Sequence, residues 1–159
     1  MKAENVAILI AWSLVFWLIP VCNISAQSGP DRSMSLDQFA GQALQEKDEV
    51  WVVDFWASWC GPCIRAVPHM KEVHERVGGE SVRFISISWD RNPAKWQSAL
   101  ERLRMPWQHI IVPKGQKAFL DEHFPHATIP TVFVIDRVGQ VKKVTNVYRV
   151  EKAIKKALK

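Results

Sequence analysis

The sequence has few cysteines, and this scarcity excludes two common ways of stabilising a small protein. Only three of the 159 residues are cysteines: Cys22, Cys60 and Cys63. A structural zinc site needs four ligands, whereas the histidines nearest to the close pair, His69 and His74, would lie on later turns of one helix. We therefore expect no metal site. One close pair also leaves no framework of structural disulfides.

The sequence also lacks an apolar run of the usual membrane-spanning length. Residues 6–21 are almost wholly apolar, but as a helix they would extend only about 24 Å, short of the roughly 30 Å hydrocarbon core. Small and polar residues follow. This pattern predicts a secretory signal peptide over residues 1–26, cleaved after Ala26, then a flexible leader over residues 27–34. The protein is then periplasmic or otherwise extracytoplasmic. An uncleaved membrane anchor and a lipid-modified Cys22 are the alternatives.

Basic and aromatic residues are not interleaved, which argues against nucleic-acid binding. The net charge is +5, and bases gather late in the chain, at Lys142, Lys143, Arg149, Lys152, Lys155, Lys156 and Lys159. Val150, Ile154 and Leu158 are spaced by four, which predicts an amphipathic helix with a basic outer face. A solvated surface helix explains this pattern, and attraction to an anionic membrane surface or an acidic partner is the alternative. Because repeats, low-complexity tracts and linkers are missing, residues 35–159 are predicted to form one domain.

What the sequence does contain is a stretch that leads from an apolar strand into a cysteine motif. Residues 50–53 are typical of a strand buried on both faces, and the carboxylate of Asp54 breaks this apolar run. An aromatic-rich turn follows, and then Cys60-Gly-Pro-Cys63. The next residues have helical periodicity, so we expect a helix to begin at Cys60. Pro62 suits the first turn of that helix, where a missing N–H is tolerated.

The two cysteines of this motif are predicted to react differently. A helix that begins at Cys60 directs unpaired backbone N–H groups and a positive dipole end toward the first sulfur. This lowers the pKa of the Cys60 thiol and favours the thiolate. Cys63 lies one turn deeper on the same helix face, so the pair can close a disulfide. We predict that Cys60 is the nucleophile and Cys63 the resolving thiol, with no cofactor beyond this redox-active disulfide.

Asp54 is predicted to serve the same chemistry. Burying an unpaired carboxylate is costly, and such a group raises its pKa and stays protonated. A buried Asp54 beneath Cys63 is suited to take the Cys63 proton, directly or through a water, when a mixed disulfide resolves. The alternative is a strand-end aspartate that caps a turn and faces water.

The remaining elements follow from periodicity and from turn residues. Ser35 is predicted to cap a helix that reaches about Glu46. The cysteine helix should run to Val77, kinked at Pro68 and ended by two glycines. The other expected elements are strands at 82–88, 109–112, 131–135 and 141–147, helices at 92–104 and 116–124, and a hairpin turn at 137–140.

The cysteine stretch resembles thioredoxin. Trp59-Cys-Gly-Pro-Cys is intact, Asp-Phe-Trp-Ala precedes it, and Pro68 stands five residues after the second cysteine, as in thioredoxin. Ile129-Pro130-Thr131 extends the likeness. In thioredoxin-like proteins such a proline follows a cis peptide bond and faces the cysteines. The resemblance implies the same here, with backbone hydrogen bonds from Ile129 to a bound peptide. The implied substrate-binding residues are Trp59, Gly61, Pro62, Ile129 and Pro130.

A more specific resemblance is to the TlpA/ResA-like thiol–disulfide oxidoreductases. An extra strand and helix lie between Val82 and Val112, and a Thr-Ile-Pro-Thr-Val-Phe-Val-Ile-Asp segment and a glycine turn follow. The implied fold is α/β: a thioredoxin fold whose central mixed β-sheet is flanked by helices, with a strand–helix unit inserted between the redox helix and the cis-proline. Asp90 falls near an acidic position of some members, which implies an acid/base role, and a turn or helix-cap aspartate is the alternative. Many members have Asn where this chain has Asp54.

The resemblance implies an exported enzyme that acts on disulfide-bearing proteins, for example in cytochrome c or metal-site maturation. A membrane-linked electron donor would recharge it, and residues 1–26 could tether it to the membrane. The Gly-Pro dipeptide favours a reductant over an oxidant. Two alternatives remain. One is a copper-handling protein, although such proteins carry Cys-x-x-x-Cys. The other is a non-catalytic adaptor, which would not need Cys60, Cys63, Asp54 and Pro130 together. The cysteine motif of peroxiredoxins is missing.

Overall fold

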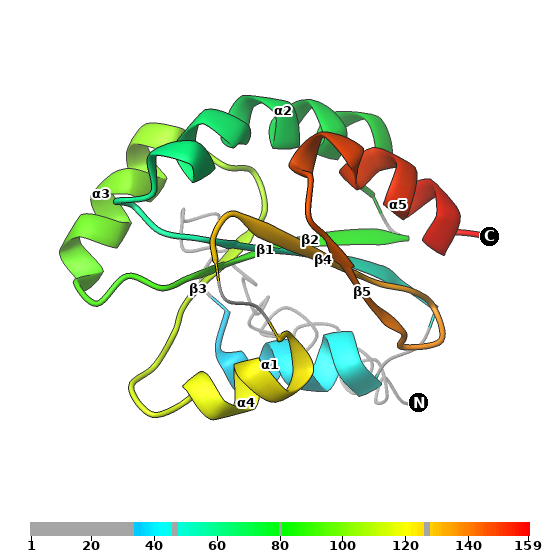
Figure 1. The fold of residues 1–159 in the computed structure, drawn as a ribbon, viewed down its shortest axis with the longest axis horizontal. Coiled ribbons are helices and arrows are strands. Elements are labelled where there is room, and N and C mark those ends of the chain that lie inside the picture. Colours follow the sequence, from blue (N-terminus) through cyan, green and yellow to red (C-terminus); the bar gives the residue numbers. More distant parts are fainter. Residues whose placement is uncertain (1–33, 46–47, 80, 126–127) are drawn as a thin grey trace, which may run out of the picture. The chain divides into compact units, whose positions relative to one another are not determined.

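A five-stranded mixed β-sheet forms the centre of the molecule (Figure 1). The computed structural model describes residues 34–45, 48–79, 81–125 and 128–159. The strands are β1 (Val50–Trp56), β2 (Val82–Ser88), β3 (Gln108–Ile111), β4 (Thr131–Ile135) and β5 (Val141–Val144). Their order across the sheet is β3-β2-β1-β4-β5. β1, β2 and β3 run parallel, whereas β4 pairs antiparallel with both β1 and β5.

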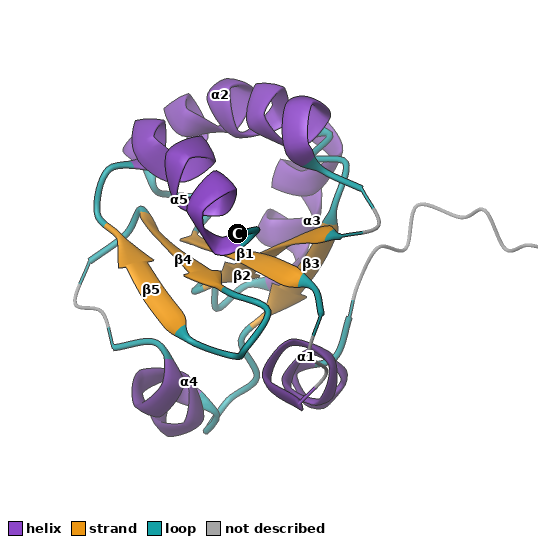
Figure 2. Cartoon of the chain, turned by 90° about the vertical axis from the view of Figure 1, so that its right-hand side faces the viewer, coloured by secondary structure: helices purple, strands orange, loops and turns teal. Residues whose placement is uncertain are grey.

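Helices cover both faces of this sheet (Figure 2). One face, which we call the reactive face, is covered by α2 (Gly61–Val77), α3 (Pro93–Leu103) and α5 (Val150–Ala157). A 3₁₀ turn, Val147–Arg149, leads into α5. The opposite face, which we call the aromatic face, is covered by α1 (Leu36–Ala40), which continues as a π-helix over Gly41–Gln45, and by α4 (Lys117–His123). The predicted thioredoxin fold is confirmed, and the helix α3 and strand β3, which follow β2, are the inserted unit.

The central strand β1 separates two hydrophobic clusters. Successive side chains of a strand point to opposite faces of the sheet. Val52 and Trp56 accordingly pack with the two cysteines on the reactive face, while Trp51 and Phe55 pack on the aromatic face. Every residue of β1 is buried. The prediction of a strand buried on both faces is therefore correct.

Some strand and helix boundaries and exposures differ from the sequence prediction. β1 does not stop at Asp54 but continues to Trp56, because the backbone of residues 54–56 stays paired with β2. β5 ends at Val144, three residues early, because Asn146 caps the 3₁₀ turn before α5. Leu158 follows α5 and is only partly buried.

The first described helix begins as predicted. Ser35 and Gln38 form a capping box, in which each side chain accepts from the other residue's backbone N–H. No helix within the described ranges is long and apolar enough to cross a bilayer. The predicted signal peptide or anchor, its cleavage site, Cys22 and the leader up to residue 33 lie outside the described residues.

Candidate active site

The two motif cysteines form a disulfide at the start of α2. Cys60 is the N-cap of α2, and its sulfur accepts a hydrogen bond from the backbone N–H of Cys63 (3.2 Å between N and Sγ). Pro62 lies in the first turn, as predicted. Cys60 and Cys63 are buried to nearly the same degree, with 5% and 4% of their surface exposed. Exposure in the oxidised state therefore does not distinguish the two cysteines, which differ in position because Cys60 is the N-cap of α2.

Asp54 lies on the reactive face of β1, between Val52 and Trp56 in the alternation of that strand. It is 9% exposed, and burial raises the pKa of its carboxyl to about 7. The Ser86 hydroxyl donates a hydrogen bond to Asp54 Oδ2 (3.3 Å), which acts in the opposite direction on the pKa. Asp54 is thus a buried carboxyl and not the water-facing turn aspartate of the alternative interpretation. It can be neutral or charged near neutral pH.

Asp90 is a buried carboxylate of a different kind. It follows β2 and accepts from the Ser58 backbone N–H (2.7 Å), the Ser58 hydroxyl (2.6 Å) and the Ser88 hydroxyl (2.7 Å). Ser58 lies two residues before Cys60, so these bonds fix the loop that delivers the chain into the cysteine motif. The geometry assigns Asp90 a loop-fastening contact, and its acid/base role stays a prediction.

The proline motif has the backbone geometry that the resemblance implied. The Ile129–Pro130 peptide bond is cis, and Thr131 begins β4, which pairs directly with β1. Thr131 Oγ1 donates to the Thr128 carbonyl (2.6 Å) and ties the segment back on itself. Ile129 and Pro130 are half-buried. Ile129 packs against the clusters of both faces.

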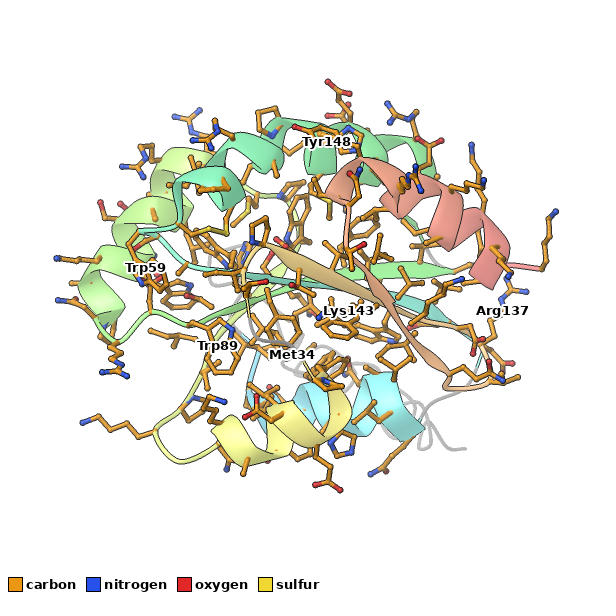
Figure 3. The ribbon with its side chains drawn as sticks, in the orientation of Figure 1. Met34, Trp59, Trp89, Arg137, Lys143 and Tyr148 are labelled. Carbon is orange, nitrogen blue, oxygen red and sulfur yellow. A yellow bond between two sulfur atoms is a disulfide. The ribbon has the colours of Figure 1, made fainter. Side chains whose placement is uncertain are left out.

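Exposed side chains flank the cysteine motif. Trp59 is 68% exposed, Pro62 is exposed and Gly61 is half-buried. Figure 3 draws Trp59 and Trp89 at one end of the domain and Arg137 at the other. Trp89 stacks on Phe55 with 6.0 Å between ring centroids. A partly exposed aromatic surface therefore lies at the end of the domain where the cysteine helix begins.

His69 and His74 have aromatic neighbours. His69 lies against Tyr148 (4.9 Å between ring centroids), and His74 lies against Phe84 and Trp107. Across the described part of the chain, no three side chains of His, Cys, Asp or Glu converge in a way that could hold a metal ion.

Sequence reasoning missed four residues near this site: Ser58, Ser86, Trp89 and Trp107. Ser58 and Ser86 are small polar residues whose partners, Asp90 and Asp54, are each 32 positions away. The indole N–H of Trp107 donates to Ser86 Oγ (2.7 Å). The signal that could have found Ser86 is a serine inside a strand that pairs with the strand of Asp54.

Comparisons with known proteins agree with this geometry. Residues 48–141 match the family model described as thioredoxin-like. The thiol:disulfide interchange protein HelX of Rhodobacter capsulatus is 27% identical over 93 residues, which cover 58% of this chain and 49% of HelX. The thiol–disulfide oxidoreductase ResA of Geobacillus thermodenitrificans is 26% identical over 92 residues, covering 58% of this chain and 51% of ResA. The chain thus spans about half the length of these two relatives.

A solved structure shares the fold. It is the crystal structure of a thiol:disulfide interchange protein of the thioredoxin family from Chlorobium tepidum. The two structures superpose with a TM-score of 0.63 at 21% sequence identity, and the match covers 71% of this chain and 82% of that one. The predicted resemblance to TlpA/ResA-like oxidoreductases is confirmed by relatives that bear such names. Because the family model matches more than half of its length, this chain belongs to the thioredoxin-like family, and it carries the Cys-x-x-Cys pair at the N-terminus of α2.

Proposed function

We propose that this protein is a thiol–disulfide oxidoreductase that reduces disulfides of protein substrates outside the cytoplasm. The observation that carries the proposal is the Cys60–Cys63 pair at the N-cap of α2, with the Cys63 N–H donating to Cys60 Sγ. A backbone donor and a helix N-terminus stabilise negative charge on that sulfur. The names of HelX and ResA describe thiol–disulfide exchange, which supports the same chemistry here.

The reaction proceeds in two exchanges. The Cys60 thiolate attacks one sulfur of a substrate disulfide, forms a mixed disulfide and releases the other substrate sulfur as a thiolate, which takes up a proton. Cys63 then loses its proton, and its thiolate attacks Cys60 Sγ. The protein disulfide forms, and the second substrate sulfur leaves and is protonated. Two electrons and two protons pass from the protein dithiol to the substrate.

Asp54 is the proposed proton acceptor for Cys63 in the second exchange. Its side chain is on the face of the sheet against which the cysteine helix packs, and burial raises its pKa to about 7. A carboxyl poised near the working pH can accept a proton and return it in the next cycle. Trp59, Pro62 and the Ile129–Pro130 segment are the proposed contacts for the substrate peptide around the reacting sulfurs.

The proposed direction is reduction, with a dithiol of a membrane-linked donor protein converting the Cys60–Cys63 disulfide back to the dithiol. The Gly-Pro dipeptide within the motif supports the direction of the reaction. The predicted signal peptide or anchor over residues 1–26 supports a membrane-linked donor outside the cytoplasm. Candidate substrates are proteins whose cysteines must be reduced before they bind haem or a metal. Equilibration with glutathione or dithiothreitol tests the direction. We expect a potential near that of thioredoxin, about −270 mV, and a value near the DsbA figure of about −120 mV would indicate an oxidant.

A trapping experiment tests the function and the roles of the two cysteines together. In Cys63→Ser the mixed disulfide on Cys60 cannot resolve, so disulfide-bonded partners should accumulate and mass spectrometry should identify them. Cys60→Ser is the matched control and should trap far fewer partners. The reverse result would exchange the two roles. If the wild-type protein did not reduce insulin, the protein would be an adaptor without catalytic cysteines.

A further inference from the structure

We infer that Ser86 and Trp107 are positioning residues for Asp54, because the Trp107 indole holds the Ser86 hydroxyl as a hydrogen-bond donor to the Asp54 carboxylate. This inference rests on the proposed function, in which Asp54 accepts the proton of Cys63. It adds two residues that lie far from the cysteine motif in the sequence. We call the three side chains the Asp54 relay.

The Asp54 relay crosses three neighbouring parts of the sheet. Asp54 on β1 is in register with Ser86 on β2, and Trp107 immediately precedes β3. Trp107 Nε1 donates to Ser86 Oγ at 2.7 Å, and Ser86 Oγ donates to Asp54 Oδ2 at 3.3 Å. Ser86 is fully buried, and the side chains at both ends are 9% exposed or less. Little bulk water therefore competes for these bonds.

The direction of the hydrogen bonds follows from the chemistry of the groups. An indole N–H can only donate, whereas a hydroxyl donates one hydrogen and accepts through two lone pairs. Trp107 therefore occupies an acceptor site of Ser86, and the single hydroxyl hydrogen is directed to the Asp54 oxygen. A donated hydrogen bond stabilises a carboxylate more than a neutral carboxyl. The relay favours the charged form of Asp54, against the effect of burial.

The position of Trp107 is fixed by its own packing. Its ring lies against Phe84 (5.7 Å between centroids) and His74 (5.4 Å). Trp107 belongs to the segment between α3 and β3, within the inserted unit. The inserted unit thus supplies the indole N–H that donates to Ser86.

Other titratable groups on the helices of the reactive face have separate partners or are exposed. On α2, Lys71 donates to the Leu103 carbonyl, His69 lies against Tyr148, and Cys60 and Cys63 form the disulfide. His74 lies against Trp107, and the buried His109 on β3 is in register with Ser86, with its Nε2 near the Met105 carbonyl. The charged side chains of α3 are exposed, and those of α5 are exposed except for Glu151, which pairs with Arg76 and Lys155. β4 places the apolar Val132 opposite Asp54.

Carbon-13 NMR measures the titration midpoint of the Asp54 carboxyl in the full chain, with labelled aspartate and with the cysteines oxidised. This measurement does not require turnover of a substrate. Asp54→Asn assigns the Asp54 carboxyl signal. In Ser86→Ala the titration midpoint of Asp54 should rise by about one pH unit, because the carboxylate loses its donor. Trp107→Phe keeps an aromatic ring but loses the N–H, and should raise the midpoint by less. The double variant should show no more than the Ser86→Ala shift, because Trp107 acts through Ser86.

Trp96→Phe is the matched control, because the Trp96 indole nitrogen is buried on the same face and has no hydrogen-bond partner among the described residues. It should leave the midpoint unchanged. An unchanged or lowered midpoint in Ser86→Ala would overturn the relay, and so would shifts that simply add in the double variant. Ser86→Ala removes one oxygen only, so the test stands even if Trp107→Phe does not fold.

A second measurement connects the relay to the reaction. The rate at which Cys63 resolves a preformed mixed disulfide on Cys60 should depend on pH, and the midpoint of that dependence should rise in Ser86→Ala by the same amount as the NMR midpoint. A shifted NMR titration with an unshifted rate profile would refute the role of the relay in proton transfer. Absence of insulin reduction by the wild-type protein would instead refute the proposed function, while the NMR result would be unaffected.

Discussion

The two faces of the sheet differ in the kinds of side chain that they bury. The aromatic face is filled by ring contacts such as those of Phe124 with Phe55 and Phe133, at 5.6 and 5.3 Å between centroids. The reactive face, equally buried, contains the disulfide, the Asp54 carboxyl and the Ser86 hydroxyl. A purely apolar face stabilises the fold, whereas a buried carboxyl destabilises it once charged. Both faces therefore stabilise the fold through apolar burial, and the reactive face also contains the groups for proton chemistry.

Two buried aspartates, Asp54 in β1 and Asp90 just after β2, extend this comparison. Asp90 accepts three hydrogen bonds of 2.6–2.7 Å, two of them from Ser58 in the loop before Cys60. Asp54 accepts a longer one from Ser86, and burial raises its pKa to about 7. Asp90 therefore holds a loop in place, whereas Asp54 is suited to exchange a proton.

The largest effect should come from the nucleophile. Cys60→Ser removes the sulfur that attacks the substrate, so insulin reduction should fall to the uncatalysed rate while circular dichroism shows an intact fold. Cys63→Ser should retain the first exchange and lose turnover. Substantial turnover in Cys60→Ser would contradict the assignment of Cys60 on the reactive face as the nucleophile.

Next in size is the loss of a ring from the aromatic face. Phe124 is fully buried, and Phe124→Ala should cost about 3–5 kcal/mol of unfolding free energy, measured by denaturant titration. The redox potential of the surviving folded protein should stay at the wild-type value, because the ring is on the face opposite the disulfide. A large change in potential would show that the two faces are not separate in function.

The buried carboxyl of Asp54 should make stability depend on pH. Its pKa is about 7 in the folded protein and 3.8 in its unperturbed state, so between these pH values the folded chain binds more protons than the unfolded chain. Stability should therefore fall as the pH rises through this window, by on the order of 4 kcal/mol in total. Asp54→Asn should remove this dependence and be more stable than wild type at pH 8. A variant that follows the wild-type pH curve would contradict the assignment.

A smaller effect is expected from the loop contact of Asp90. Asp90→Ala leaves the Ser58 N–H without its acceptor and should cost about 1–3 kcal/mol. It should also slow insulin reduction several-fold, because the loop before Cys60 loses its attachment. Asp136 is a matched control, since it accepts from two backbone N–H groups in the turn before β5. Asp136→Ala should lower stability and leave the rate alone, and equal rate losses in both variants would argue against a positioning effect.

The smallest effect belongs to the exposed ion pairs. Arg83 contacts Glu49 at 3.1 Å, and the Arg83 side chain is 54% exposed. Arg83→Gln should change the unfolding free energy by less than about 1 kcal/mol, as is usual for surface pairs. A larger loss, tested at low and high salt, would mean that surface charge contributes to the fold alongside the aromatic face.

Much of the fold could be predicted from sequence because local signals and apolar periodicity agreed. The Cys60 N-cap, the Ser35 cap and the strand at Thr131–Ile135 have short-range causes, and the structure has them where they were expected. The cis bond before Pro130 came from resemblance and not from local chemistry. The end of β1 was misjudged because a polar Asp54 looked like a strand end, although its backbone remained fully paired.

The hydrogen-bonded partners within the site could not be predicted in the same way. Ser58 and Asp90, like Ser86 and Asp54, are brought together by the parallel pairing of β1 and β2, which no local pattern specifies. The contact of Trp107 depends additionally on the inserted unit placing one indole N–H over one hydroxyl. Such contacts depend on register and packing across the sheet.

The most direct test is the alkylation rate of Cys60 in the reduced protein. The account requires that the N-terminus of α2 and the Cys63 N–H stabilise the Cys60 thiolate. At neutral pH, iodoacetamide should therefore label Cys60 faster than free cysteine and faster than Cys63. Labelling of Cys60 no faster than free cysteine would contradict the account.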